Sequence, residues 1–361
     1  MPIQLFSFFS GLGLLDLGFE DAGFNIVFVN ELNDQYLRSY QYMRRNLDHI
    51  PEYGYSQKDI RVFLDDAEWG TTFPNCENRD NRIVGFLGGP PCPDYSVAGK
   101  NEGERGKNGQ LTTAYIRLIE KRHPDFFVLE NVKGLVQTKK HKQYYERIKR
   151  RLYRAGYSVF DSVENALLYG SPQYRERLFL VGIRRESFGN RLEYAFGGHR
   201  AYTFEQINNA NWPTTDPFIE NGELPQAENI IGELTVEHWF RQNHVNNHPN
   251  SIDVFNIRNE ERYNTIPEGD SRGKSFKRLH RWRYSPTAAY GNNEVHLHPY
   301  HARRISVAEA LAIQSAPEYV SIPADLPLSV KFKMVSNGVP YLMALGIARD
   351  LYDWINHHLN E

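Results

Sequence analysis

Residues 3–31 read IQLFSFFSGLGLLDLGFEDAGFNIVFVNE, and this stretch sets how the first third of the chain folds. An apolar run over residues 3–9 predicts a buried strand, and the glycines within residues 11–13 then predict a turn. Leucines and phenylalanines at helical spacing follow, and a second apolar run at residues 25–30 predicts the next strand, with Glu31 just beyond it. A strand, a glycine turn, a helix and a second strand together predict a βαβ unit in a parallel sheet.

The acid at the end of this unit predicts a ligand that carries a ribose. In nucleotide-binding folds an acid about 20 residues beyond the first glycine accepts hydrogen bonds from ribose hydroxyls, and Glu31 stands at that separation from Gly11. A dinucleotide site has its third glycine where this chain has Asp16, whose carboxylate would repel a pyrophosphate. S-adenosylmethionine has a ribose, no phosphate and a cationic sulfonium, so it tolerates the acid. A plain structural turn, with Glu31 as a solvated loop acid, is the alternative.

The alternation of strands and helices continues beyond the first unit. Further strands are predicted at residues 83–87, 125–132 and 178–183, and helices at residues 34–45, 111–122, 139–155 and 306–315. The pattern predicts an α/β fold with a Rossmann-like, mostly parallel sheet.

Residues 88–100, GGPPCPDYSVAGK, follow a predicted strand and carry Cys92, one of only two cysteines. Most lone cysteines are small core hydrophobes. Here the neighbouring prolines, which lack amide donors, cannot pack as the interior of an element. We therefore expect the thiol to be presented on a stiff loop at the carboxyl end of a strand, where open α/β sheets place their chemistry.

Two further stretches carry candidate catalytic groups. Glu130 follows a run of large apolar residues, and the resulting desolvation would raise its pKa and allow it to donate a proton near neutral pH. A glutamate that only caps the next turn is the alternative. Arg175 and Arg177 lie two positions apart, so in an extended segment they share one face and could hold an anionic or carbonyl oxygen. Ordinary surface ion pairs would explain them equally.

Composition limits the class of protein. The chain has 361 residues, a net charge of −2 and 24% charged residues, so any nucleic-acid contact must come from a local basic surface. Two cysteines without a CxxC spacing fit a reducing cytoplasm and exclude a cysteine-based zinc site. We see no signal peptide at the amino terminus and no apolar run of the roughly 18 residues that a membrane span needs.

From about residue 187 the alternation fades, and between residues 271 and 304 basic residues gather. This run holds eight lysines and arginines against one acid, interleaved with aromatic residues, which predicts a phosphate-facing surface. A solvated basic loop is the alternative. His296, His298 and His301 lie close together in sequence, but without neighbouring carboxylates they do not predict a metal site.

Taken together, these stretches resemble the DNA cytosine-5 methyltransferases, over most of the chain. The matching motifs occur in the family's order: Phe9-Ser10-Gly11-Leu12-Gly13, Gly89-Pro90-Pro91-Cys92, Glu130-Asn131-Val132, Gln173 to Arg177, residues 304–315 and Asn337-Gly338-Val339-Pro340. Departures from the family pattern are Leu14 for a glycine, Pro93 for a glutamine, Tyr95 for a phenylalanine, and Ser336-Asn337-Gly338 for Gly-Asn-Ala or Gly-Asn-Ser.

The resemblance implies S-adenosylmethionine as cofactor and a division of the chain into two domains. Residues 1–186 with 330–361 would form the catalytic, cofactor-binding domain, and residues 187–329 a smaller, loop-rich target-recognition domain. The cofactor-binding residues implied are Phe9, Ser10, Gly11, Leu12, Gly13, Glu31, Asp59, Ile60, Pro91, Leu111, Asn337 and Val339.

The resemblance also implies the reaction. Cys92 would add to carbon 6 of a flipped-out cytosine in a specific duplex DNA sequence, Glu130 would protonate ring N3, and Arg175 would hold the base carbonyl with support from Arg177. DNA contacts are expected from Ser96, Lys100, Arg272, Lys274, Arg278, Arg281, Arg283 and Arg303. A lean chain of this size is typical of a cytoplasmic, monomeric methyltransferase of a bacterial or phage restriction-modification system, with a cognate endonuclease as a possible partner. A tRNA cytosine-5 methyltransferase on the same fold and a non-enzymatic binding protein are the rival interpretations.

Overall fold

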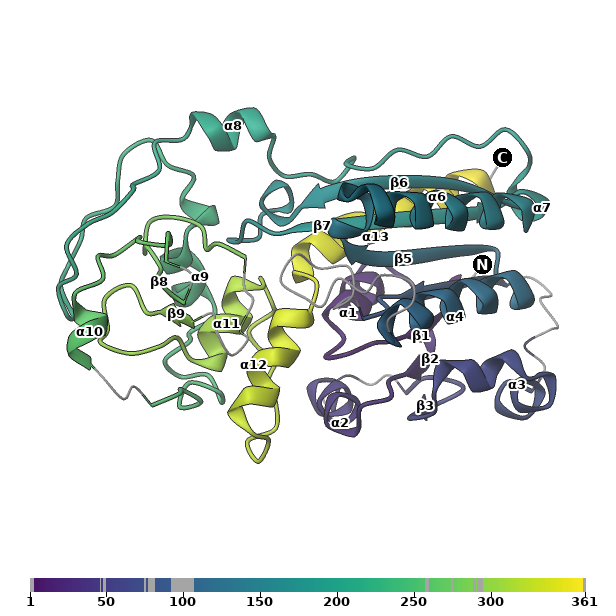
Figure 1. The fold of residues 1–361 in the computed structure, drawn as a ribbon, viewed down its shortest axis with the longest axis horizontal. Coiled ribbons are helices and arrows are strands. Elements are labelled where there is room, and N and C mark those ends of the chain that lie inside the picture. Colours follow the sequence, from purple (N-terminus) through teal and green to yellow (C-terminus); the bar gives the residue numbers. More distant parts are fainter. Residues whose placement is uncertain are drawn as a thin grey trace.

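A seven-stranded sheet forms the centre of the larger part of the molecule (Figure 1). The structure is a computed structural model, and it describes residues 3–45, 47, 50–74, 76, 82–91, 107–256, 260–273, 275–287, 290 and 295–359. No helix within these ranges is long and apolar enough to cross a membrane.

The sheet is mostly parallel, which confirms the predicted fold class. Its strands are β1 (Ile3–Phe8), β2 (Asn25–Asn30), β3 (Tyr55–Ser56), β4 (Ile83–Gly88), β5 (Phe126–Val132), β6 (Tyr157–Asn165) and β7 (Glu176–Arg184). They lie in the order β3-β2-β1-β4-β5-β7-β6, and only the pairings of β7 with β5 and β6 are antiparallel. The strand order reverses between β1 and β4, and α/β sheets bind ligands at the carboxyl ends of the strands at such a point.

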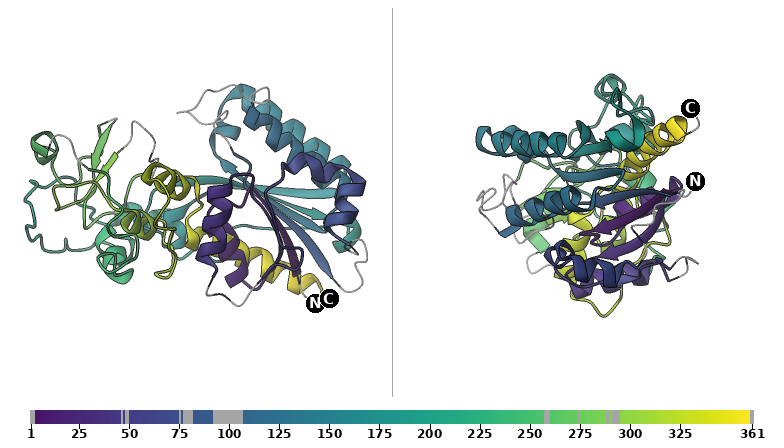
Figure 2. Two further views of the ribbon diagram at one scale, coloured as in Figure 1. Left: turned by 90° about the horizontal axis from the view of Figure 1, so that it is seen from below. Right: turned by 90° about the vertical axis from the view of Figure 1, so that its right-hand side faces the viewer.

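Helices cover both faces of this sheet because its strand residues alternate between two hydrophobic cores. One core holds Leu5 and Ile26, and the other holds Phe6 and Phe28. Figure 2 shows α4 and α6 on one face and α13 on the other. The helices of this part are α1 (Leu14–Asp21), α2 (Asp34–Met43), α3 (Asp66–Thr72), α4 (Lys107–Arg122), α5 (Gly134–Gln137), α6 (Lys139–Arg154), α7 (Arg185–Phe188) and α13 (Tyr341–Leu359), with short 3₁₀ turns at η1 (Ile60–Leu64) and η3 (Ala166–Tyr169).

The chain's last helix packs directly on its first. A Cβ atom built on Gly18 of α1 would lie 2.6 Å from the backbone nitrogen of Leu345 and 2.7 Å from Cβ of Ala344, both in α13. Only glycine allows this approach, so the carboxyl-terminal segment is fixed beside the first βαβ unit, as the resemblance implies.

The left-hand part of Figure 1 contains little regular structure. Its elements are α8 (Phe204–Asn209), η4 (Gly232–Leu234), α9 (Val236–Gln242), α10 (Glu260–Asn264), β8 (Phe276–Arg278), β9 (Val295–Leu297), α11 (Val307–Ile313) and α12 (Leu328–Asn337). This agrees with the loop-rich composition seen in the sequence.

Both ends of the segment 187–329 share packing with the sheet-bearing part. At its start, Phe188 and Tyr194 make edge-to-face contacts with Trp354 of α13. At its end, α11 and α12 join one hydrophobic core with Leu14 and Leu17 of α1. The two-domain division at residues 186 and 330 stays a prediction, and continuous cores cross both of its boundaries.

Candidate active site

The glycine turn after β1 is closed on one side and open on the other. Phe9 and Gly11 have positive φ angles of 58° and 57°, and Gly13, at 90°, caps the start of α1. A Cβ atom on Gly13 would lie 2.5 Å from Tyr40 and Arg44, whereas one on Gly11 would meet nothing within 4 Å. The turn is therefore packed against α2 while the backbone at Gly11 borders open space.

Glu31 joins this turn to the end of β2. Its carboxylate accepts hydrogen bonds from the backbone amides of Gly11 (2.9 Å) and Asn33 (2.8 Å). Burial raises the pKa of Glu31, and hydrogen bonds from the backbone amides of Asn33, Gly11 and Leu32 oppose that rise. Glu31 is thus an organising acid at the edge of the sheet and not a solvated loop residue, and its carboxylate keeps acceptor capacity for another donor.

The other predicted cofactor positions lie around the same edge. Asp59 caps η1 through the amide of Arg61 and forms an ion pair with the Arg61 side chain at 2.6 Å, while Ile60 is buried. Phe9 and Leu111 are partly buried and pack against the hydrophobic core that contains Ile60. Of the other predicted cofactor-binding residues, Leu12 and Val339 are buried. Asn337 is exposed at the end of α12, and Pro91 is exposed after β4.

Sequence reasoning missed Tyr36 of α2. Its hydroxyl lies against Asn337 and near the Glu31 carboxylate, and burial raises its pKa. The side chain therefore bridges α2 and the end of α12 beside Glu31. Nothing in the spacing of Tyr36 distinguishes it from the other aromatic residues of this helix, so only the structure reveals it.

Glu130 lies within β5, deep in the carboxyl-end edge of the sheet. Its carboxylate forms an ion pair with Nε of Arg177 at 3.0 Å, and the two side chains are only 11% and 13% exposed. Desolvation raises the pKa of Glu130 although the charges of Arg177 and Arg175 lower it. This direction agrees with the expectation drawn from the apolar run before it.

The backbone that leads to Cys92 lies against Glu130. Gly88 pairs with Leu129 in the sheet, and a Cβ atom on Gly89 would lie 3.0 Å from Oε2 of Glu130. Gly89 thus has a role that the sequence motif did not reveal, because it allows the chain to pass directly over the carboxyl group. Cys92 itself, together with Ser96, Lys100 and Lys274, lies outside the described residues.

Arg175 and Arg177 have different partners in the structure. Arg177 contacts the Glu130 carboxylate directly. Arg175 is 1% exposed, and its Nη2 donates to the backbone carbonyls of Ser336 (2.5 Å) and Gly338 (2.9 Å). Part of the Arg175 guanidinium is therefore engaged by the protein backbone, and its predicted role in holding the base carbonyl stays a prediction.

Asp16 does not face the turn as the sequence argument assumed. It is buried, it accepts a hydrogen bond from the Tyr40 hydroxyl at 3.0 Å, and burial raises its pKa to about 6. The carboxyl group is turned toward α2, so its charge is not an argument against a dinucleotide.

The predicted phosphate-facing surface is partly wrong. Arg278 is fully buried and donates to the backbone carbonyls of Tyr263, Ile266 and His298, and its desolvation lowers its pKa to about 10. Arg281 is buried in a bidentate ion pair with Glu268. Neither guanidinium is available to a phosphate.

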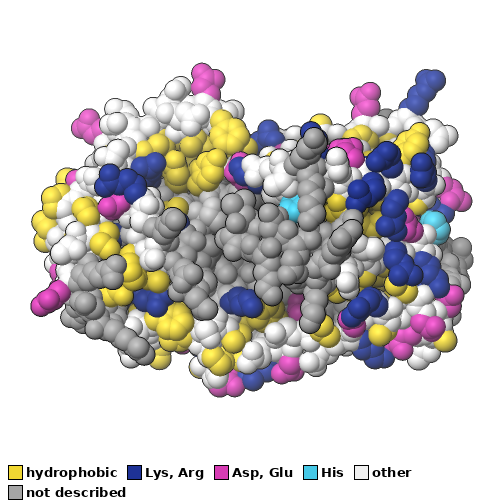
Figure 3. Space-filling view, viewed as in Figure 1, with side chains coloured by type: hydrophobic (Ala, Val, Ile, Leu, Met, Phe, Trp, Pro, Cys, Tyr) yellow, Lys and Arg dark blue, Asp and Glu magenta, His cyan; other side chains and the backbone are white. Residues whose placement is uncertain are grey.

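The other predicted contacts are more accessible. Arg272 is exposed and pairs with Asp270 at 3.1 Å, Arg283 is half-buried, and Arg303 holds Glu309 at 2.6 Å with 30% of its side chain exposed. On the face shown in Figure 3, Lys and Arg side chains also gather over α4 and α6, where Lys142, Arg150 and Arg154 are exposed. The basic helix at residues 139–155 is thus a solvated surface, as expected.

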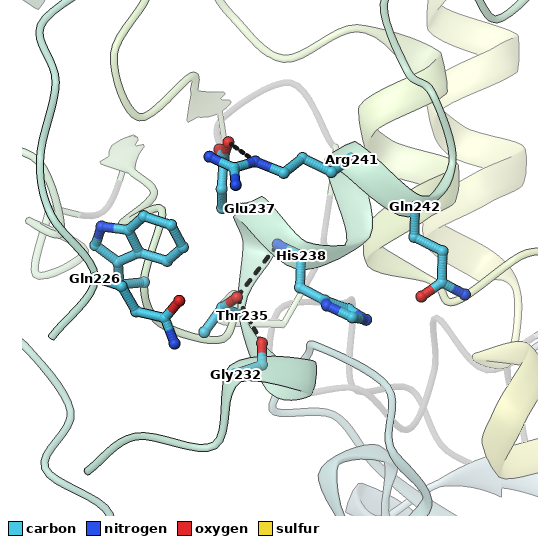
Figure 4. Close-up of a pocket in the computed structure, with 8 residues that line it drawn as sticks. Gln226, Gly232, Thr235, Glu237, His238, Arg241 and Gln242 are labelled. Atoms are coloured by element: carbon cyan, nitrogen blue, oxygen red, sulfur yellow. Dashed lines mark hydrogen bonds and ion pairs between the residues drawn. The ribbon is translucent and has the colours of Figure 1, made fainter. Parts of the chain in front are cut away.

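A cavity of about 460 Å³ lies elsewhere, in the segment 187–329 (Figure 4). The residues that line it include Thr235, His238 and Trp282, together with Glu237 and Arg241 of α9, which form an ion pair at 2.8 Å. None of the predicted site residues lines it. Among the residues that the structure describes, no three histidine, cysteine or acidic side chains are grouped as metal ligands, and His298 instead lies 3.4 Å from Glu309.

The glycine turn, Glu31 and the Glu130–Arg177 pair therefore all meet at the carboxyl ends of β1, β2, β4 and β5. The family model described as C-5 cytosine-specific DNA methylase matches residues 3–353. The chain belongs to this family. As a member it is a DNA (cytosine-5-)-methyltransferase, so it acts on DNA and requires a methyl donor.

Curated relatives and solved structures extend this result. The chain is similar to type II methyltransferase M.NmeDI of Neisseria meningitidis serogroup C, at 48% identity over 359 residues that cover 98% of this chain and 84% of that protein. Type II methyltransferase M.MthTI of Methanothermobacter thermautotrophicus is 30% identical, covering 97% of each chain. In fold the chain is similar to a candidate DNA modification methyltransferase encoded within an E. coli prophage, with a TM-score of 0.65, 20% identity and coverage of 98% and 99%.

The residues at the glycine turn fit a donor with a ribose and an amino acid part. Gly11 borders open space, and Oγ of Ser10 is buried without a hydrogen-bond partner among the described residues. Buried polar atoms are normally paired, so a ligand that bonds to Ser10 and to the Glu31 carboxylate would complete the site.

Proposed function

We propose that this methyltransferase takes its methyl group from S-adenosylmethionine and transfers it to carbon 5 of a flipped-out cytosine within a specific duplex DNA sequence. The observation that carries the proposal is the buried Glu130 carboxyl group, paired with Arg177 at 3.0 Å and covered by the backbone at Gly89, three residues before Cys92. This arrangement supports Glu130 as the proton donor, because it lies beside the backbone that leads from β4 to Cys92.

The donor would be held by the glycine turn and Glu31, with Asp59 and Ile60 at the adenine end and Asn337 and Val339 closing the other side. When bound, S-adenosylmethionine supplies an electrophilic methyl group. Phe9, Pro91 and Leu111 would provide apolar walls. Glu31 would accept hydrogen bonds from the ribose hydroxyls through the lone pairs that the Gly11 and Asn33 amides leave free.

The chain's own residues would make the cytosine ring reactive. The thiolate of Cys92 adds to carbon 6, and its electron pair forms the new carbon–sulfur bond. Glu130 donates its proton to ring N3 as electron density moves there, which leaves an enamine whose carbon 5 is nucleophilic. Because Arg177 contacts Glu130 directly, we assign to Arg177 the orientation of this acid, while Arg175, with support from Arg177, is proposed to hold the base carbonyl. Extruding the base costs a few kcal/mol, which contacts along the DNA must offset.

Residues 187–329 are proposed as the target-recognition domain. Arg272, Arg283 and Arg303 remain candidates for phosphate contacts because each keeps part of its side chain accessible. Similarity to type II methyltransferases supports a restriction-modification system with a cognate endonuclease. The enzyme is proposed to act as a monomer.

The experiment that tests this function compares radiolabelled methyl transfer from S-adenosylmethionine to duplex DNA and to tRNA. We expect label in DNA only, at a sequence that mapping of 5-methylcytosine in host DNA then identifies. Cys92→Ala should abolish transfer, and duplex DNA with 5-fluorocytosine at the mapped position should form a complex with wild-type enzyme that survives denaturing electrophoresis. Label in tRNA, or full activity of Cys92→Ala, would overturn the proposal.

A further inference from the structure

Arg175 connects two parts of the site that are far apart in the sequence. Its Nη2 bonds to the carbonyls of Ser336 and Gly338, which flank Asn337 at the end of α12. The last carbonyls of a helix have no partner within the helix, and a cation there is favourable. This side chain therefore fixes the final turn of α12 and the segment that leads to Val339.

The same guanidinium also lies within electrostatic reach of the catalytic pair. The charge of Arg175 lowers the pKa of Glu130, and the charge of Arg177 lowers the pKa of Arg175 beyond the effect of burial. Arg175 is thus bonded to the proposed cofactor wall on one side and acts on the Glu130–Arg177 pair on the other.

Neighbouring polar contacts hold these segments in one arrangement. Ser171 Oγ lies 2.7 Å from Ser315 Oγ, and Ser315 Oγ accepts from the amide of Leu342 at 3.1 Å. Gln314 Nε2 donates to the carbonyl of Val335 at 2.9 Å. Ser171 lies in the loop before β7, and Gln314 and Ser315 lie just after α11. These buried or partly buried contacts therefore join the loop that carries Arg175 to α12 and α13 through the end of α11. Separating these segments would leave buried polar atoms without partners, which is unfavourable.

We propose that Arg175 is a positioning residue that couples the cofactor wall at residues 336–339 to the Glu130–Arg177 pair, so that donor binding and target-base binding strengthen each other. The proposal rests on the proposed function, because it assumes that residues 336–339 border the donor. Coupling of this kind is reciprocal, and its usual size is about 5- to 150-fold in affinity.

Arg175→Lys tests the coupling because it keeps the charge but replaces a planar fork, which can serve two carbonyls and a neighbouring charge, by a compact ammonium group. The affinity of S-adenosylhomocysteine is measured with and without duplex DNA that carries the mapped target sequence. Wild-type enzyme should bind it at least about fivefold more tightly with DNA present, at the lower end of the usual range, and Arg175→Lys should reduce this ratio toward one.

Arg278→Lys is the matched control, since Arg278 is equally buried and also donates to backbone carbonyls, but within the segment 187–329. It should lower stability while leaving the ratio unchanged. A wild-type ratio near one, an unchanged ratio in Arg175→Lys, or an equal loss in Arg278→Lys would each overturn the coupling. If wild-type enzyme binds no S-adenosylhomocysteine at all, the proposed donor fails first and the coupling with it.

Hydrogen exchange of the wild-type enzyme gives a second test that does not depend on a folded variant. S-adenosylhomocysteine alone should slow amide exchange at residues 336–342 and also at Glu176 and Arg177 of β7. Protection confined to the glycine turn and residues 336–342 would overturn the proposal, although it would support the donor site itself.

Discussion

Replacing Glu31 by alanine removes a carboxylate that accepts hydrogen bonds from two backbone amides and is proposed to bind the ribose of the donor. The two carboxylate oxygens accept the amides of Gly11 and Asn33 at 2.9 and 2.8 Å, and their remaining lone pairs are proposed to accept ribose hydroxyls. A hydrogen bond to a charged group contributes about 1.5–3 kcal/mol. Loss of at least one such bond to the donor corresponds to an increase in Kd of about 10- to 150-fold, since each 1.4 kcal/mol is a factor of ten.

Isothermal titration of S-adenosylhomocysteine into wild-type enzyme and Glu31→Ala measures this change directly. Asp34→Ala is the matched control because Asp34 is an exposed acid three positions along the chain, in the first turn of α2. We expect its Kd to stay within about twofold of wild type, as is usual for surface substitutions worth under about 0.5 kcal/mol. If Glu31→Ala has circular dichroism like wild type and also binds within twofold, the placement of the ribose at Glu31 is refuted.

The pH dependence of binding supplies an independent check. Burial raises the pKa of Glu31 above its ordinary value, and only the ionised carboxylate accepts at both oxygens. Affinity should therefore fall as the pH drops through this raised pKa. In Glu31→Gln, which has no titrating group at this position, that fall should disappear.

Two further substitutions test the acid and the fold. Glu130→Gln should lower kcat by about 10²- to 10⁴-fold because it removes a general acid. In the wild-type enzyme kcat/KM should decline as the pH rises through the raised pKa of Glu130, and this decline should be lost in Glu130→Gln. An identical pH profile in both enzymes would contradict this role. Gly18→Val should lower the free energy of unfolding by about 1–3 kcal/mol by overpacking against α13, measured by urea denaturation. Gly70→Ala, at an exposed helical glycine whose Cβ would meet nothing within 4 Å, should instead be neutral or stabilise by up to about 1 kcal/mol.

The fold was predictable because its signals are local. Apolar runs of strand length and glycine turns recur along the first 184 residues, and the structure places β1, β2, β4 and β5 within one or two residues of the predicted ranges. For the last segment, residues 332–359, the pattern predicts an apolar helix. This part of the chain forms two helices, α12 and α13, because Gly338 and Pro340 interrupt it.

The basic surface was harder to predict because charge counts ignore partners outside the counted window. Residues 271–304 contain one acid, but Glu268 and Glu309 lie just beyond its two ends. Glu268 binds Arg281 and Glu309 binds Arg303, so acids that the count left out neutralise two of the arginines. The buried guanidinium of Arg278 instead donates hydrogen bonds to backbone carbonyls. Which cations remain free depends on tertiary contacts, which no window of sequence contains.

The surroundings of Glu130 show why a carboxyl group between arginines can still act as an acid. An arginine 3.0 Å away would ordinarily lower the pKa of a carboxyl group by one to three units, yet desolvation is the larger effect and its pKa is raised. A flipped cytosine entering this site would displace remaining water and offer N3 as an acceptor, so desolvation would increase while Arg177 stays in contact. In the proposed reaction the proton would then be favoured on Glu130 until electron density moves onto N3, and Arg177 would stabilise the carboxylate that remains after transfer. In this proposed mechanism the ion pair with Arg177 would stabilise Glu130 after it has given up its proton. Its attraction has to stay weaker than the desolvation effect so that Glu130 is protonated beforehand.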